Sequence, residues 1–163
     1  MRNRFLLGWA IALILGFCLP PAFGAGGLGE ELMTKVMYNE PGEVAALLEK
    51  AADVNYRAPD SGSTPLMMAS TYGFEDIARM LIEKGADVNL QANNGATALT
   101  GACRRHPDIA RLLLANGAKV DIVSAATGGP FTASIIYAVS NNGDTSLAEM
   151  LLQNGADIDE APA

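Results

Sequence analysis

The sequence predicts an all-α repeat solenoid, which is a stack of short helix-turn-helix units. The first observation is a recurrence, because Thr-Ala-Leu at 97–99 stands 33 places after Thr-Pro-Leu at 64–66. The second is an apolar stripe of helical period after each start, closed by glycine. The third is composition, since 50% hydrophobic and 6% aromatic residues in 163 suit one small helical domain. A recurrence at this interval is typical of stacked repeats.

The first 24 residues predict a secretory signal peptide rather than a part of the fold. Arg2 and Arg4 precede an apolar run over 5–19, and small residues follow it. This order of a basic start, an apolar centre and a small-residue exit predicts cleavage after Gly24. We therefore expect a periplasmic or secreted protein. The alternative is a membrane anchor formed by the uncleaved signal, although the run is shorter than the ~20 residues that a spanning helix needs.

Charge and cysteine content narrow the classes of function. Removal of residues 1–24 takes away two of the 11 basic side chains and none of the 18 acidic ones, which leaves a net charge of −9 on 25–163. Such an acidic surface argues against binding to nucleic acid or, after signal cleavage, to a membrane. Cys103 is then the only cysteine, so an internal disulfide is excluded. We expect a monomer that is stabilised by stacking.

An irregular first copy is predicted over about 28–58. Its Leu-Leu-Glu-Lys at 47–50 stands 34 places before Leu-Ile-Glu-Lys at 81–84. It lacks the Thr-Pro-Leu start, carries Glu31 and Lys35 where an internal helix would be apolar, and has Ala51 instead of the closing glycine. Because the outermost unit of a stack has one side in water, these substitutions indicate a capping repeat.

The second copy, about 59–91, shows the unit most clearly. Thr64 can cap the first N–H groups of a helix, and Pro65 suits the next position because its missing N–H has no partner there. Gly73 supplies the turn to a second helix. The apolar stripe of that helix consists of Ile77, Met80 and Leu81. Gly85 then predicts a left-handed helix ending.

These residues resemble the ankyrin repeat family, whose unit runs Gly-x-Thr-Pro-Leu-His-x-Ala, a glycine turn, a hydrophobic second helix and Gly-Ala-Asp-Val-Asn. Residues 62–89 match this pattern almost throughout, with Met67 in place of the usual histidine. The pattern recurs in fixed order along about four fifths of the chain, so the match is specific. The resemblance implies helix pairs joined by β-hairpin-like fingers. It also implies that Leu66, Leu99 and Ile136 occupy equivalent places in successive layers.

The third copy, about 92–123, has a shorter turn, with His106-Pro107 where the family has glycine. Pro107 is expected to begin its second helix. The connection to the fourth copy, about 131–160, is longer, and we expect an elongated finger with Gly128-Gly129-Pro130 near its bend. The fourth copy restores the register of the second at a distance of 70 residues. The prediction is therefore a leader followed by one domain of four repeats.

A thiol-dependent enzyme or redox protein is the alternative function. Cys103 and His106, the only histidine, flank Arg104-Arg105, and cationic neighbours can lower the pKa of a thiol. However, Cys103 aligns with Ser70, a small packing position, and no carboxylate is placed to orient the histidine. One histidine and one cysteine also fall short of a four-ligand metal site. We therefore predict no enzyme, no cofactor and no metal.

Protein binding is the favoured function, and the resemblance implies that it occurs on a concave surface of fingers and first helices. The implied residues are Asp60, Ser61, Ser63, Thr71 and Tyr72 in the second copy, Asn93, Asn94, Ala96, Thr100, Arg104 and Arg105 in the third, and Tyr137, Asn141 and Asn142 in the fourth. Tyrosine and arginine are favoured at the energetic centres of interfaces. The two arginines predict a partner surface with carboxylates, or alternatively they only offset acidic neighbours.

The predicted partner is another exported protein, because the leader directs the chain out of the cytoplasm. Three roles fit such a binding module: an inhibitor, an immunity factor or a protective subunit of an enzyme. The contact positions of a repeat scaffold vary with the target while its core stays constant, so the partner is predicted by class alone.

Overall fold

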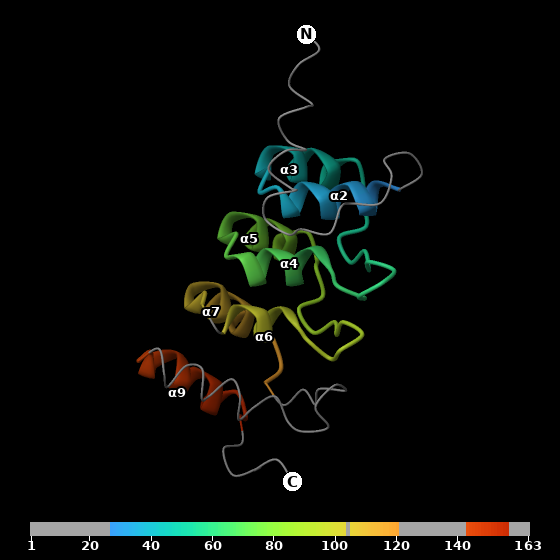
Figure 1. The fold of residues 1–163 in the computed structure, drawn as a ribbon. Coiled ribbons are helices and arrows are strands. Elements are labelled where there is room, and N and C mark those ends of the chain that lie inside the picture. The colour runs from blue at the N-terminus through green and yellow to red at the C-terminus, as the bar shows by residue number, and fades with distance from the viewer. Residues whose placement is uncertain (1–26, 104, 121–142, 157–163) are drawn as a thin grey trace, which may run out of the picture.

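The structure of the chain is a computed structural model, which describes residues 27–103, 105–120 and 143–156. Within these ranges the helices form successive layers, from the blue first layer to the red last helix (Figure 1). Each of the first three layers consists of two helices joined by a short turn. This arrangement confirms the predicted all-α repeat solenoid.

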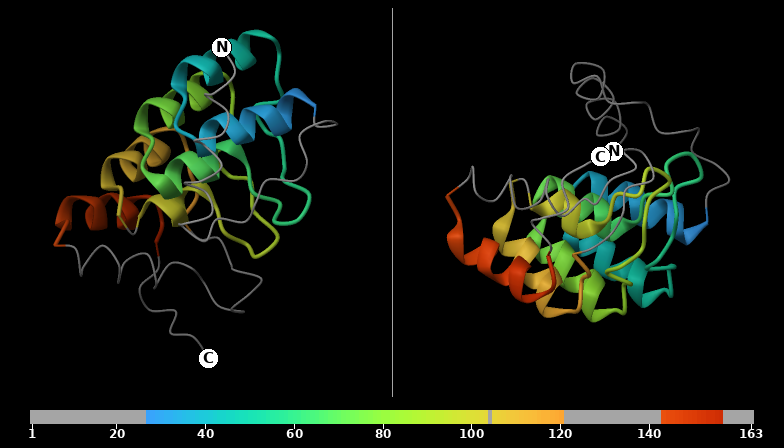
Figure 2. Two further views of the ribbon diagram at one scale, coloured as in Figure 1. Left: turned by 45° about the horizontal axis from the view of Figure 1, so that its top comes forward. Right: turned by 90° about the horizontal axis from the view of Figure 1, so that it is seen from below.

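The described helices fall into two columns. The first helices of the repeats, α2, α4 and α6, contact one another in succession, as do the second helices, α3, α5, α7 and α9. Figure 2 shows the stack from two further directions. The bounds are Leu28–Met37 (α2), Pro41–Glu49 (α3), Pro65–Tyr72 (α4), Glu75–Glu83 (α5), Ala98–Ala102 (α6), Pro107–Ala115 (α7) and Thr145–Gln153 (α9).

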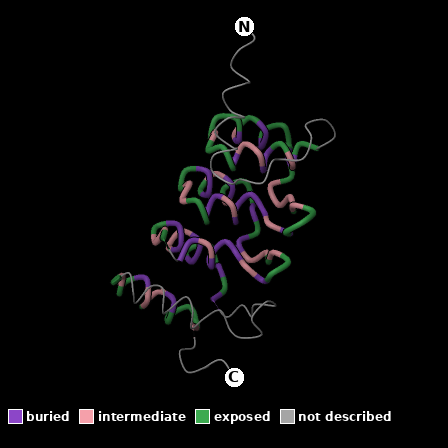
Figure 3. The backbone as a smooth tube through the Cα atoms, in the orientation of Figure 1, coloured by how far each residue is buried: buried purple, intermediate pink, exposed green. Residues whose placement is uncertain are grey.

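Equivalent leucines of successive repeats fill the core. In the first column the buried members are Leu32, Leu66 and Leu99, and in the second column they are Leu47, Leu81, Leu113 and Leu151. Figure 3 shows these buried stretches running through every layer, with exposed residues along the outside. The predicted equivalence of Leu66 and Leu99 is therefore confirmed, whereas Ile136 lies outside the described residues.

Reciprocal hydrogen bonds begin the first helices of the second and third repeats. Thr64 Oγ1 accepts the Met67 N–H (3.3 Å), and the Thr64 N–H donates to the Met67 sulfur (3.4 Å). In the same way Thr97 Oγ1 accepts the Thr100 N–H (3.3 Å), and the Thr97 N–H donates to Thr100 Oγ1 (2.9 Å). Each pair satisfies N–H groups that a helix start leaves open. Met67, which replaces the histidine usual in the family, thus helps to cap the start of α4.

The first repeat has the polar outer side expected of a cap. Glu31 is exposed, and the half-buried Lys35 pairs with Glu40 across the turn, with Nζ 2.6 Å from Oε2. Ala51 adopts a left-handed conformation (φ 61°) at the place where Gly85 closes the second repeat (φ 87°). The helix ending is therefore kept although alanine replaces glycine.

The connections between the repeats are tight turns that project as fingers. The Ala58 N–H donates to the Ser63 carbonyl oxygen (2.9 Å) in the first finger, and the Ala92 N–H donates to the Ala96 carbonyl oxygen (2.8 Å) in the second. These bonds make the fingers hairpin-like, although the residues described include no assigned strand. The elongated finger predicted around 128–130 lies outside the described residues.

The predicted leader at 1–24 also lies outside the described residues, as does the first helix expected for the fourth repeat. Among the helices that the structure describes, none combines the length and the apolar character of a membrane span. The layers from α2 to α7, together with α9, therefore provide the frame for the surface described next.

Candidate partner-binding surface

Thr71 and Tyr72 lie at the exposed end of α4. The Thr71 hydroxyl donates to the Met67 carbonyl oxygen (2.8 Å), which binds it to its own helix. Tyr72 is 41% exposed, and its ring stacks on Phe74 with the ring centroids 5.9 Å apart and the ring planes at 23°. An aromatic ring that is already held at the surface loses little conformational entropy when a partner covers it. The position of Tyr72 therefore suits a contact residue.

The predicted asparagines connect and shape the fingers. The Asn93 N–H donates to the Ser61 carbonyl oxygen (2.8 Å), and Asn93 Nδ2 donates to the Asp60 carbonyl oxygen (3.1 Å) of the preceding finger. The Asn94 side-chain oxygen accepts the Ala96 N–H (3.0 Å) within its own finger. Both asparagines are exposed, so they line the surface and also fix its shape.

Exposed arginines lie in the first finger and in the turn after α6. Arg105 is exposed in the turn after α6, whereas Arg104 lies outside the described residues. Arg57, which was not among the predicted contact residues, is exposed in the first finger, and its Nη2 donates to the Gln91 carbonyl oxygen (2.7 Å). The sequence signal for Arg57 is its place in the finger, three residues before the predicted Asp60.

Thr100 is not a surface residue, so the prediction that it contacts a partner is wrong. Its hydroxyl donates to the Thr97 carbonyl oxygen (2.8 Å) and closes the helix start, which buries the side chain. Among the remaining predicted residues, Asp60 and Ser61 are exposed, and Ser63 and Ala96 are half-buried. The predictions for Tyr137, Asn141 and Asn142 lie outside the described residues.

Charge is divided between the two columns. Helices α4 and α6 contain no charged side chain, and within the first column acidic helix residues occur in the end helix α2. The second helices carry Glu43 and Glu49 (α3), Glu75, Asp76 and Glu83 (α5), Asp108 (α7) and Glu149 (α9). With Arg79 in α5 and Arg111 in α7 counted, α3, α5 and α9 are net negative and α7 is neutral. An acidic partner therefore meets more repulsion from α3, α5 and α9 than from α4 and α6.

Cys103 does not have the properties of a nucleophile. It is 2% exposed, and burial raises the pKa of its thiol to about 12. Such a thiol stays protonated near neutral pH, whereas nucleophiles and metal ligands are thiolates. The His106 ring lies against Gly73, where any added side chain would collide with it. Cys103 therefore fits the packing role predicted from its alignment with the buried Ser70. Over the described ranges, no three His, Cys, Asp or Glu side chains gather as a metal site requires.

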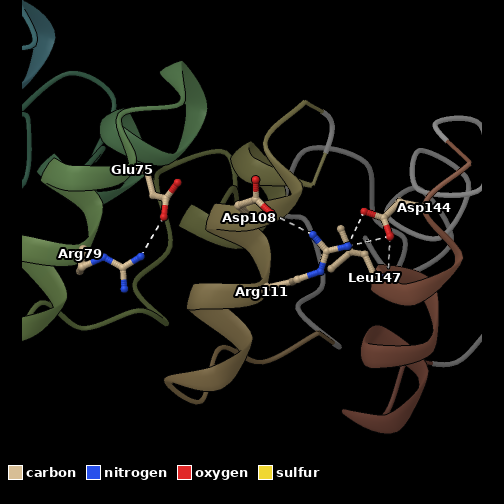
Figure 4. Close-up of polar contacts among 6 residues, drawn as sticks. All are labelled: Glu75, Arg79, Asp108, Arg111, Asp144 and Leu147. Atoms are coloured by element: carbon tan, nitrogen blue, oxygen red, sulfur yellow. Dashed lines mark hydrogen bonds and ion pairs between the residues drawn. The ribbon is translucent and has the colours of Figure 1, made fainter.

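The second-helix column carries ion pairs on its outer side (Figure 4). Arg79 pairs with Glu75 within α5, with Nη2 2.8 Å from Oε1, and Arg111 pairs with Asp108 within α7, with Nη1 3.1 Å from Oδ1. These partners are three or four residues apart on one helix, where exposed pairs contribute little to stability.

Arg111 also reaches the next repeat. Its Nη2 lies 2.8 Å and 2.6 Å from the two carboxylate oxygens of Asp144. Asp144 Oδ1 in turn accepts the Leu147 N–H (3.0 Å) at the start of α9. The bond from the Leu147 N–H, assisted by Arg111, holds the pKa of Asp144 below its usual range. This cluster joins the third and fourth repeats. Its charged groups pair with one another, so their positions do not require a bound ligand.

Comparison with known families agrees with this repeat architecture. A family profile described as "Ankyrin repeats (3 copies)" matches residues 32–124, and one described as "Ankyrin repeat" matches residues 132–161. The chain belongs to the ankyrin repeat family. The second match includes sequence beyond the described residues and agrees with a fourth ankyrin repeat there. Ankyrin repeats are protein-interaction modules, which is consistent with a protein partner.

Similar proteins occur in animals and plants. Ankyrin repeat and SOCS box protein 16 of Homo sapiens is 39% identical over 119 residues, which cover 68% of this chain and 25% of that protein. SH3 and multiple ankyrin repeat domains protein 1 of Mus musculus is 35% identical over 118 residues, 71% of this chain and 5% of that protein. Probable E3 ubiquitin-protein ligase XBOS33 of Oryza sativa subsp. japonica is 34% identical over 117 residues, which cover 69% of this chain and 22% of that protein. The chain thus spans a quarter or less of these relatives.

Proposed function

We propose that this ankyrin repeat protein binds another exported protein through the fingers and the ends of its first helices. We call this surface the finger face. Its described members are Asp60, Ser61, Thr71, Tyr72, Asn93, Asn94 and Arg105. The observation that carries the proposal is the division of charge, because α3, α5 and α9 are net negative whereas α4 and α6 contain no charged side chain. An acidic partner therefore meets less repulsion at α4 and α6.

Tyr72 and Arg105 are the residues that we expect to contribute most to binding. Tyrosine and arginine dominate the energetic centres of protein interfaces. Arg105 belongs to a chain with a net charge of −7, and its guanidinium complements a carboxylate of the partner. The support for this choice is their exposure and the fixed ring of Tyr72.

The test is capture of the partner from the envelope fraction of the organism. The purified protein is compared with the Tyr72→Ala variant and with the paired Arg104→Glu and Arg105→Glu variant. We expect each to recover less partner, with affinity reduced on the order of tenfold or more. The matched control is Arg79→Glu on α5, which reverses an exposed charge in the other column and leaves capture unchanged. Undiminished capture by the paired arginine variant would show that the finger face is wrongly placed.

Export is a separate part of the proposal. It is supported by the basic start, the apolar run over 5–19 and the small residues up to Gly24. N-terminal sequencing of protein recovered from fractionated cells should find Ala25 first, in the periplasm or the medium. A chain that begins at Met1 in the membrane fraction would instead identify the uncleaved anchor. In the exported compartment the proposed roles are inhibitor, immunity factor or protective subunit of the captured protein.

Catalysis by Cys103 is the alternative function, which we do not favour. One variant distinguishes an enzymatic function from partner binding. We propose that the protein is not an enzyme, because the buried thiol with its raised pKa lacks the reactivity that the mechanism requires. The Cys103→Ser variant should keep full partner capture, and thiol titration of the folded protein should show no fast-reacting group. Loss of a measured activity in this variant, together with fast thiol reaction, would favour the enzyme.

A further inference from the structure

Helix α9 is the last layer that the structure describes, and one of its sides keeps apolar residues that are poorly covered (Figure 1). In the preceding layer α9 itself packs on α7, where Ala110 and Leu114 are 0% and 5% exposed. Their equivalents in α9 stand 38 places further on. These are Ala148, which is half-buried, and Leu152, which is 43% exposed.

The first repeat shows which side these positions face. Val44 and Leu48 of α3 stand 34 places before Ala78 and Ile82, the equivalent positions of α5, and are 0% and 8% exposed. Because the structure describes no layer before the first repeat, the burial of these two side chains does not depend on a preceding layer. The positions of Val44 and Leu48 therefore face the layer that follows.

The two ends of the described stack differ in polarity. The position that faces the preceding layer is 0%, 2% and 1% exposed in Ile77, Ile109 and Leu147, whereas the first repeat has the exposed Glu43 there. At the other end Leu152 stays apolar at the position that faces a following layer. The outer side of a terminal repeat is normally polar, which keeps the stack soluble. The first end thus suits water, whereas the outer side of α9 suits a covering partner.

The outer side of α9 also carries an exposed carboxylate. Arg111 of α7 reaches the next repeat, with its Nη2 2.6 Å from Asp144 Oδ2. Glu149 stands 38 places after Arg111, so it has the place on α9 from which a side chain reaches a following layer. Over the described ranges Glu149 forms no ion pair. We call Ala148, Glu149 and Leu152 the open face, since residues three and four apart share one side of a helix.

The charge of the C-terminal part of the chain distinguishes between possible occupants. Residues 121–163 contain no lysine, arginine or histidine, and their six acidic residues are Asp121, Asp144, Glu149, Asp157, Asp159 and Glu160. A second copy of the chain, joined through the same face, would bring these like charges together, which is unfavourable. A partner with lysine or arginine beside its apolar residues gains attraction instead. The open face therefore favours a basic partner over a second copy.

We infer that the open face binds a basic amphipathic helix of another protein, with apolar side chains of that helix on Ala148 and Leu152 and a lysine or arginine at Glu149. A helix is expected because the same side of α7 is covered by a helix, α9. Amphipathic helices dock on apolar surfaces through residues three and four places apart. A charge-assisted hydrogen bond to Glu149 adds orientation to this contact. The inference is independent of the finger face, to which α9 contributes no residue.

The test measures the binding of synthetic peptides to the purified protein by fluorescence anisotropy. The labelled probe has about 18 residues, which is long enough for a helix, with leucines along one face and lysines beside them. The control peptide has the same composition, but its leucines are distributed around the helix. We expect the probe to bind about tenfold more tightly than the control, because only the probe presents an apolar stripe.

Variants assign the binding to the open face. Leu152→Gln removes an apolar contact and Glu149→Gln removes the carboxylate, so each should weaken binding of the probe by about fivefold or more. The matched controls lie in other layers. Leu28→Gln changes a side chain of similar exposure (41%) in α2, and Glu83→Gln removes an exposed carboxylate from α5. Both controls should bind the probe as the unaltered protein does.

Several outcomes would overturn the inference. These are equal binding of the two peptides, no binding of the probe at ~1 mM, or equal weakening by the open-face variants and their controls. If sedimentation shows a dimer of the free protein that Leu152→Gln abolishes, a second copy covers the open face and the inference fails. It also fails if the probe binds only after residues 160–163 are removed, because the end of the chain itself then covers this face.

The Tyr72→Ala variant separates this inference from the proposed function. This variant should weaken capture of the partner at the finger face and leave binding of the probe unchanged. If capture does not depend on Tyr72 but the probe binds at the open face, the proposed function fails and the inference stands. Loss of probe binding in the Tyr72→Ala variant would show that the probe does not bind at α9.

Discussion

The junctions between the first three repeats differ from the junction between the third and the fourth. At the first two junctions neutral side chains bond to the backbone of the next repeat. Asn55 Oδ1 accepts the Asp87 N–H (2.8 Å), and Asn89 accepts the Lys119 N–H (2.8 Å) while its Nδ2 donates to the Gly117 carbonyl oxygen (3.0 Å). At the third junction, in the part of the chain that the structure describes, the polar connection is the ion pair of Arg111 with Asp144.

The difference implies that the layers respond unequally to their surroundings. Hydrogen bonds between neutral groups change little with salt or with pH, whereas a partly exposed ion pair is screened by salt and lost when its carboxylate is protonated. The first junction also has an ion pair, Lys84 with Glu49, but it is exposed and adds little beside the Asn55 bond. We therefore expect α9 to be the layer that salt and acid loosen first.

The largest expected effect comes from removing equivalent core leucines from the two regions. Leu81 and Leu151 are both fully buried. Leu81→Ala should lower the free energy of unfolding of the stack by about 2–5 kcal/mol, because the cavity lies between two layers. Leu151→Ala, in the last described layer, should mainly speed amide exchange in α9. Denaturant unfolding measures the change in stability, and hydrogen exchange measures the local opening of each helix. If the two variants changed exchange equally in α5 and α9, the two regions would not differ in the way that we propose.

A smaller effect is expected from the neutral junction. Asn89→Ala removes two hydrogen bonds between the second and third repeats and should cost about 1–2 kcal/mol of stability. Because no charge is lost, the cost should be the same at low and at high salt in urea titrations. A cost that disappears at high salt would show that the neutral junction also depends on electrostatics.

Arg111 and Arg79 provide a matched pair for the charged junction. Arg111→Met breaks the connection to Asp144 and should speed amide exchange in α9, and salt should reduce the difference from the unaltered protein. Arg79→Met, at the equivalent place on α5, breaks only the pair with Glu75 and should change stability by about 0.5 kcal/mol or less. The same exchange rate in α9 for both variants would contradict the role of Arg111.

Acid should weaken the charged junction through Asp144. Its pKa is lowered in the folded protein, so its stabilising contribution is present above the unfolded pKa of about 3.9 and is lost as the pH falls through the folded value. Amide signals of α9 should therefore broaden below about pH 4, before those of α4 and α5 do. The Asp144→Asn variant, which keeps a capping side chain, should show no such additional change in this range.

Much of the fold could be predicted from the sequence because the repeat register determines it. The helix start at Thr64, the turn at Gly73 and the ending at Gly85 follow from local chemistry that acts within a few residues. The Arg111 and Asp144 pair could not be predicted in this way, because its members belong to different repeats with a long connection between them. Asp144 has a local signal only as a helix cap.

The candidate surface was predicted less completely than the fold. Thr100 was misplaced because a threonine hydroxyl can face a partner or close its own helix start, and composition does not distinguish these uses. Arg57 was not selected, although it stands three residues before the selected Asp60 in the same finger. Asn93 was selected as a contact residue, but its hydrogen bonds to the preceding finger could not be predicted, because they join residues more than 30 places apart in the sequence.

Hydrogen exchange of the free protein and of its complex with the captured partner tests the central claim most directly. The proposed function predicts slower exchange in the fingers, at 58–63 and 92–96, and at the end of α4. Exchange in α5 and α7 should stay unchanged, because these helices belong to the second column and contribute no residue to the finger face. Slower exchange confined to α3, α5 and α7, with the fingers unaffected, would contradict the assignment of the finger face as the binding surface.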